Sequence, residues 1–276
     1  MFNRNRCSRK IEEAPFPLIL FSAIMMISVV APLFCMLLIS FKEKNSYITN
    51  PYGIVGVHWT IRNYISMFTD FHVMRKIANS VVVSLGTASL VCLIAIPTAY
   101  EMLYINPKIR NITQIIMLAF VFMPTQLTLI VKYQLFLKLG LIDKFLSVVL
   151  SGTADWLPTC ILLLTIYFQN IDADIFFAAR LDGCNDFNII FKILIPISSP
   201  AITVVFINTF TGMWNSFLEP MLFLRSEHMK LLMNSLAGLV ERYRNNIPFQ
   251  MAGYVLGMIP TLLLYTIFKS NILARK

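Results

Sequence analysis

Charged residues are scarce in this sequence. Asp, Glu, Lys and Arg make up 13% of the 276 residues, whereas hydrophobic residues make up 57%. Soluble domains carry about 25% charged residues, because most of their surface faces water. The composition therefore excludes an ordinary soluble domain and indicates a protein that is embedded in a lipid bilayer.

Residue types that carry chemistry are also few. The three histidines and five cysteines show no CxxC and no Cys/His ligand spacing, which argues against a disulfide framework and a metal site. Paired carboxylates and an activated nucleophile are missing as well, so we expect no catalytic residue. The chain has no G-x-x-x-x-G-K-[ST] loop and is therefore not expected to bind ATP itself.

The net charge of +9 could suggest a nucleic-acid partner. The basic residues are scattered between apolar runs, however, and form neither a stripe nor a known nucleic-acid-binding motif. We therefore expect basic loops that face water and lipid headgroups, and no nucleic acid.

Long apolar runs dominate what is present. A helix that crosses a bilayer needs roughly 20 apolar residues, and six runs have about that length. Because the runs are continuous and do not alternate in polarity, they predict helices and not barrel strands. We predict an all-α, polytopic membrane protein whose single domain covers residues 1–276. The predicted spans are about 16–41, 77–100, 112–131, 146–168, 197–218 and 251–272.

The orientation depends on the N-terminal end. Arg4, Arg6, Arg9 and Lys10 precede the first apolar run, which is too long for the core of a cleavable signal peptide. With these four included, Lys and Arg are divided almost evenly between the two sides, so their total does not decide the orientation. Since the first span usually dominates the orientation, we predict an uncleaved first span and cytoplasmic positions for both termini.

Two outer loops carry helical signals. Thr60 can cap a short amphipathic helix that follows it, and the loop at 223–250 has an apolar centre at 231–240. In the last span, Gly253 and Gly257 form a G-x-x-x-G pattern, which favours close helix packing.

A polar segment at 169–196 separates the fourth and fifth spans. Asp172 or Asp174 can cap a first short helix over 175–181, which Gly183 would end in a left-handed conformation. A second short helix would follow directly. Both helices are too short and too polar to cross the bilayer.

The second short helix of this segment covers 186–194. Asn185 can cap it, and Pro196 marks its junction with the fifth span. In the first helix, Ala178 and Ala179 form a small-residue surface that allows close approach by a partner.

The combination of Ala178-Ala179, Gly183 and Ile193-x-x-Pro196 resembles the coupling-loop signature of binding-protein-dependent ABC importer permeases. The match is best with the sugar-importer group that has six spans. The resemblance covers roughly 16–268. Its flanking motifs are Asn63-Tyr64, Trp214-Asn215-x-Phe217-Leu218 and Met251-Ala252.

The resemblance implies a transport subunit that is not itself an enzyme. Two related permease subunits would form the path across a prokaryotic plasma membrane, and two separate ATPase subunits would bind ATP and Mg. An extracytoplasmic binding protein would deliver a sugar or oligosaccharide. The residues that would couple to the ATPases are Asp174, Phe176, Phe177, Ala178, Ala179, Asp182, Gly183, Ile193 and Pro196.

The chain departs from this family at the first short helix. Phe177 stands where the family usually has a glutamate, and Phe176 occupies a second position that is usually acidic. Two exposed aromatic residues are typical of an interface, so we expect a more hydrophobic joint with the ATPase.

Asp155 is a carboxylate inside the predicted fourth span and is the most prominent polar residue of the predicted spans. A carboxylate there costs roughly 2.5–3.5 kcal/mol to insert and usually has a function. Asp155 could accept hydrogen bonds from sugar hydroxyls while the neighbouring Trp156 lies against a sugar ring. Alternatively, Asp155 is hydrated near the outer mouth or binds backbone freed by Pro158. Further candidates for the path, which could instead bond between helices or form an interfacial belt, are Gln126, Asn208, Thr209, Trp214 and Asn215.

An ion-coupled secondary transporter of a small polar solute is the alternative function. It would need coupling carboxylates near the midplane. Asp155 is the clear candidate for that role, and the halves of the chain show no evident inverted repeat. The sequence does not distinguish oligosaccharide, monosaccharide and polyol phosphate as substrates.

Overall fold

The computed structural model describes residues 16–273, with the side chains of residues 17–269. The basic cluster at Arg4, Arg6, Arg9 and Lys10, which carries the predicted orientation, lies outside the described residues. Within residues 16–273 the chain is helical and has no β-strand, apart from one isolated bridge between Lys42 and Trp59.

Four helices are long and apolar enough to cross a membrane. They are α1 (Phe16–Ser40), α4 (Val73–Glu101), α7 (Phe145–Phe168) and α14 (Ile247–Leu273). They correspond to the predicted first, second, fourth and sixth spans. α7 runs unbroken through Asp155 and Pro158.

Two bent helix pairs bring the number of candidate spans to six if each pair counts as one. In the first pair, α5 (Pro107–Val121) meets α6 (Thr125–Lys138) at 89°. In the second, the segment Asp186–Ile197 meets α11 (Ser199–Trp214) at 83°. That segment consists of α9 (Asp186–Ile189), the π-helical η1 (Ile190–Leu194) and α10 (Ile195–Ile197).

The predicted third span at 112–131 is therefore not one straight helix. The chain leaves α5 after Val121 and turns before α6, with Pro124 at the N-cap of α6. Proline lacks a backbone N–H and disfavours the helical conformation of the residue before it. The apolar run continues through this break, which is why hydropathy alone merges the two helices.

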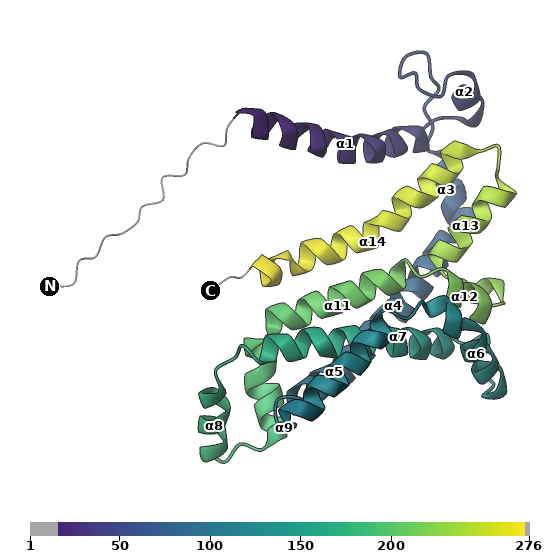
Figure 1. Ribbon diagram of the computed structural model, residues 1–276. Helices are drawn as coiled ribbons and strands as arrows, with labels where there is room; N and C mark the ends of the chain where they lie inside the picture. The colour runs from purple at the N-terminus through teal and green to yellow at the C-terminus, as the bar shows by residue number, and fades with distance from the viewer. Residues whose placement is uncertain (1–15, 274–276) are drawn as a thin grey trace.

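α4 lies at the centre of the bundle and packs against α7 and α11 (Figure 1). Half of the residues that α4 buries are small, and they include Ser80, Ser84, Ala88, Ala95 and Ala99. Small side chains let neighbouring helices approach closely inside a membrane. α1 packs against α14 and exposes most of its apolar side chains, as expected of a helix that faces lipid.

The remaining helices are short and cap the bundle. At one end lie α2 (Lys44–Thr49), α3 (Arg62–Thr69), α12 (Leu218–Phe223), η2 (Glu227–Met229) and α13 (Leu232–Arg242). α8 (Ala173–Leu181) lies at the opposite end, together with the start of α1 and the end of α14 (Figure 1).

The helix predicted after Thr60 is present, but its N-cap is Ile61 and not Thr60. Thr60 Oγ1 accepts a hydrogen bond from the backbone N of Arg62 at the start of α3 (3.0 Å). The G-x-x-x-G pattern allows close packing, but its neighbour is the loop helix α13: a Cβ on Gly253 would lie 2.6 Å from Cδ2 of Leu236. The apolar centre at 231–240 thus forms part of the core.

Candidate functional site

A cavity of about 460 Å³ lies between α7, α11 and α12. Asp155 and Trp156 line it from α7, Gly212 from α11, and Glu219 from α12. Thr125, at the start of α6, completes one wall. The lining combines carboxylates, hydroxyls and an indole, which are groups that can bind a polyhydroxylated solute.

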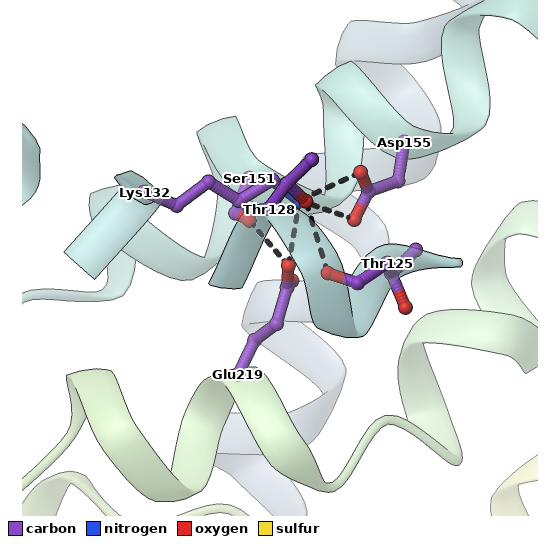
Figure 2. Close-up of polar contacts among 6 residues, drawn as sticks. All are labelled: Thr125, Thr128, Lys132, Ser151, Asp155 and Glu219. Carbon is purple, nitrogen blue, oxygen red and sulfur yellow. Dashed lines mark hydrogen bonds and ion pairs between the residues drawn. The ribbon is translucent and has the colours of Figure 1, made fainter. Parts of the chain in front are cut away.

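An ion cluster of Lys132, Asp155 and Glu219 closes one side of this cavity (Figure 2). Lys132 Nζ donates to both carboxylate oxygens of Asp155, at 2.6 and 2.7 Å, and to Glu219 Oε1 at 2.8 Å. Ser151 Oγ donates to the same glutamate oxygen at 2.6 Å. The cluster therefore ties α6, α7 and α12 together.

The three charged side chains of the ion cluster are largely removed from solvent. Their exposed fractions are 16% for Lys132, 24% for Asp155 and 10% for Glu219. Two carboxylates surround one ammonium group, so the cluster leaves an excess of hydrogen-bond acceptors beside the cavity. Asp155 is neither simply hydrated nor bound to backbone near Pro158, because both of its oxygens accept from Lys132.

The indole of Trp156 packs directly against a glycine on the facing helix. The indole lies so close to Gly212 of α11 that a Cβ there would collide with ring atom Cζ2. The absence of a side chain at Gly212 thus makes room for the indole at the cavity wall.

Gly212→Ala is expected to lower the free energy of unfolding by about 1–3 kcal/mol, because it overpacks the contact with Trp156. Gly86→Ala is the matched control, since a Cβ there would meet Val149 at an ordinary 3.5 Å. Chemical denaturation of both variants measures the difference. Equal stability of the two variants would contradict this packing.

The polar segment between α7 and α11 has the local structure that the sequence predicts. Asp172 Oδ1 caps α8 by accepting from the backbone N of Asp174 (3.1 Å). Gly183 has a φ of +83°, in the left-handed region. Asn185 Oδ1 caps α9 by accepting from the backbone N of Asn188 (2.9 Å).

Polar contacts join this loop to the end of α4. Asp186 accepts from Arg180 Nη2 (3.0 Å) and from the hydroxyl of Tyr100 (2.9 Å). Arg180 also stacks over the ring of Tyr104, at 4.4 Å from the ring centroid. The hydrogen bond from Arg180, followed by that from Tyr100, holds the pKa of Asp186 below its ordinary value. The carboxylate therefore stays charged at neutral pH.

The two phenylalanines of α8 face in different directions. Phe177 is 59% exposed, but Phe176 is only 5% exposed and packs edge-on against Tyr100 at 6.0 Å between ring centroids. The expectation that both are exposed is wrong for Phe176, because consecutive residues of a helix point about 100° apart. For the same reason Ala179, three residues after Phe176, is buried, whereas Ala178 is exposed.

The other predicted coupling residues are mostly on the surface. Asp174, Asp182, Gly183 and Pro196 are exposed, whereas Ile193 is half-buried against the core. The exposed and buried faces of α8 therefore separate residues that can touch a partner from residues that attach the helix to the bundle.

Comparison with known proteins identifies the family. The sequence model of the family described as binding-protein-dependent transport system inner membrane component matches residues 91–275, which is more than half of the chain. The chain belongs to this family. The match covers the C-terminal part of α4, the residues that line the cavity and the loop that contains α8.

Individual relatives of this transport permease align over most of its length. It is 27% identical to the diacetylchitobiose uptake system permease protein NgcG of Streptomyces coelicolor, over 92% of this chain and 83% of the relative. It is 28% identical to the arabinooligosaccharides transport system permease protein AraQ of Halalkalibacterium halodurans, over 89% and 88%.

The fold agrees with that of a solved transporter. A chain in the crystal structure of a bacterial ABC transporter involved in the import of the acidic polysaccharide alginate matches with a TM-score of 0.75. The match covers 91% of this permease and 93% of that chain, at 21% identity. At this identity the likeness shows a shared fold.

The permease brings only two of the predicted path residues to the cavity, Asp155 and Trp156. Trp214 is buried in the core, where its indole N–H donates to the carbonyl of Gly257 (3.1 Å). Thr209 is also buried, 3.4 Å from the sulfur of Cys160. Both side chains pack inside the bundle in this structure, and a role for them in the path stays a prediction.

The other three predicted path residues do not line the cavity. Asn215 is exposed and donates to the carbonyl of Thr211 (2.9 Å). Gln126 and Asn208 are exposed on α6 and α11. A role for these three in the path stays a prediction.

Lys132 is the member of the ion cluster that the sequence does not single out. The predicted third span ends at Val131, and a cation directly at the end of an apolar run looks like an ordinary flanking charge. Its partner Glu219 likewise follows the fifth span. The residues described in the permease contain no group of three or more His, Cys, Asp or Glu that could hold a metal ion.

Proposed function

We propose that this chain is one of two permease subunits of an ATP-driven importer, and that it translocates a sugar or oligosaccharide delivered by an extracytoplasmic binding protein. The relatives are named for diacetylchitobiose and arabinooligosaccharide transport, which supports a carbohydrate as the substrate. The observation that carries the proposal is the ordered two-helix loop at one end of the bundle, within the matched part of the chain.

The loop that contains α8 contacts the two ATPase subunits in this proposal and is therefore cytoplasmic. The start of α1 and the end of α14 lie at the same end of the bundle (Figure 1), so both termini are cytoplasmic as well. The cavity and the ion cluster, which α6 and α12 help to form, then belong to the extracytoplasmic half.

α8 transmits the movement of the ATPases through its two faces. ATP and Mg bind to the ATPase subunits, and their closure moves the exposed face with Phe177 and Leu181, which is 89% exposed. The buried face, with Phe176 and Ala179, carries that movement to α4 and the end of α7. The exposed aromatic ring replaces the family's carboxylate, so the joint is apolar.

Asp155 and Trp156 form the sugar-contacting part of this subunit. Asp155→Asn is expected to lower transport by about tenfold or more, since hydrogen bonds to a charged group contribute about 1.5–3 kcal/mol. Trp156→Ala should act in the same direction. Uptake of radiolabelled sugar by the reconstituted transporter measures both, with the exposed Trp59→Ala as control. Unchanged uptake in both cavity variants would remove this role.

Co-purification tests the assembly. A tagged form of this chain should retain a second permease and two copies of an ATPase in stoichiometric amounts. Transport by the chain alone in vesicles would instead support an ion-coupled secondary transporter. In that alternative Asp155, which is paired with Lys132, would be the coupling carboxylate.

A further inference from the structure

A small pocket lies where α4, α5, α7 and α8 meet. It has a volume of about 200 Å³, and its polar lining comes from Arg110, Arg180, Tyr104 and Gln169. None of its described lining residues carries a carboxylate. Two guanidinium groups without an acid in the wall favour an anionic ligand, and guanidinium matches phosphate especially well.

Of the two arginines, Arg110 has a hydrogen-bond donor that is unpaired within the described part of the chain. Its Nε is buried and has no hydrogen-bond partner among the described residues. Arg180 binds Asp186 and Tyr100 through the same nitrogen, Nη2. A buried donor without a partner is destabilising, and a ligand oxygen that accepts from Arg110 Nε would remove this penalty.

The pocket lies at the depth of lipid headgroups. It is lined by residues that follow directly after two spans, Leu103 and Tyr104 after α4 and Gln169 after α7. Apolar helices end where the hydrocarbon core gives way to the headgroup region. This placement holds whichever side of the membrane the loop occupies.

An apolar groove continues from the pocket toward the middle of the membrane. It has a volume of about 620 Å³ between α5 and α7, and Gln169 lines both the groove and the pocket. Its walls are mainly aliphatic, including Leu118, Leu162 and Ile166. An acyl chain attached to a headgroup in the pocket would lie in this groove.

We propose that the pocket at Arg110 and Arg180 binds the headgroup phosphate of an anionic phospholipid, whose acyl chain occupies the groove between α5 and α7. The site touches α8 through the buried Phe176 and through the exposed Phe177 and Arg180. A lipid bound there would brace α8 against α5, two helices that come from different parts of the chain.

Native mass spectrometry of the purified full-length chain tests this site. The chain should retain one dioleoyl phosphatidylglycerol more tightly than dioleoyl phosphatidylcholine. Arg110→Gln should weaken this retention about fivefold or more, since a basic residue at an anionic headgroup contributes about 1 kcal/mol or more. Lys108→Gln is the matched control, because Lys108 is exposed on the same helix and does not line the pocket.

Four results would overturn the proposal. The first is equal retention of the two lipids. The second is equal loss in Arg110→Gln and Lys108→Gln, with unchanged melting temperatures showing that both variants fold. The third is displacement of the lipid by inorganic phosphate, which would assign the pocket to a soluble anion. The fourth is loss of the lipid when the second permease binds, which would make the groove a subunit interface. None of these results depends on the transported substrate, so they leave the proposed function untouched.

Discussion

Lys132→Met is expected to lower the free energy of unfolding by about 3–5 kcal/mol, because removal of one partner leaves the others charged and poorly solvated. Asp155 and Glu219 would then face each other across the cavity without the ammonium group that separates them. Equilibrium unfolding of the purified chain in mixed detergent measures this change.

Lys138→Met is the control for this variant. Lys138 lies on the same helix, is exposed, and forms no ion pair among the described residues. Combining Lys132→Met with Asp155→Asn and Glu219→Gln should recover most of the lost stability, since no unpaired charge remains. If the triple variant were as unstable as Lys132→Met alone, the loss would come from packing of the lysine stem and not from charge.

Phe176→Ala is expected to cost about 3–5 kcal/mol of stability, as is typical when a buried aromatic side chain is truncated. Phe177→Ala, one residue further on, should change stability by less than about 0.5 kcal/mol, because an exposed side chain makes few contacts. The two variants remove the same atoms from adjacent positions, so each serves as the control of the other.

Coupled transport separates the roles of the same two residues. Phe177→Ala should lower sugar uptake per ATP hydrolysed while the chain remains fully folded, since it removes the proposed contact with the ATPase. Phe177→Glu restores the family's residue type and should not raise coupling with the native ATPase, whose groove is expected to be apolar. Higher coupling in Phe177→Glu would contradict the hydrophobic joint.

The spans could be predicted because their signal is local. A run of about 20 apolar residues has few alternatives to a membrane helix, and the predicted spans at 77–100 and 146–168 coincide with α4 and α7. Hydropathy, however, does not report the direction in which a helix runs. The 89° turn between α5 and α6 therefore cannot be predicted from hydropathy, although Pro124 lies at the turn.

The loop around α8 could be predicted for the same reason. A helix cap depends on residues two or three positions apart, so Asp172, Gly183 and Asn185 could be assigned from the sequence. Which side chain of α8 faces the bundle depends on Tyr100, far away in the chain. For that reason the burial of Phe176 was not foreseen.

The ion cluster lies beyond sequence reasoning. Lys132 is separated by 23 residues from Asp155 and by 87 from Glu219, and no local pattern connects them. Asp155 stood out because a carboxylate inside a span is costly. A nearby cation lowers the energetic cost of burying this carboxylate, and Lys132 on α6 is that cation.

The small residues of α4 have a mechanical consequence. Large side chains interlock across a helix interface, so two helices that slide past each other must change rotamers. Ser80, Ser84, Ala88, Ala95 and Ala99 present little to interlock, and we expect α7 and α11 to shift along α4 by shear without unpacking. A transporter that alternates between two states needs a surface on which its parts can move, and we expect this part of α4 to provide it.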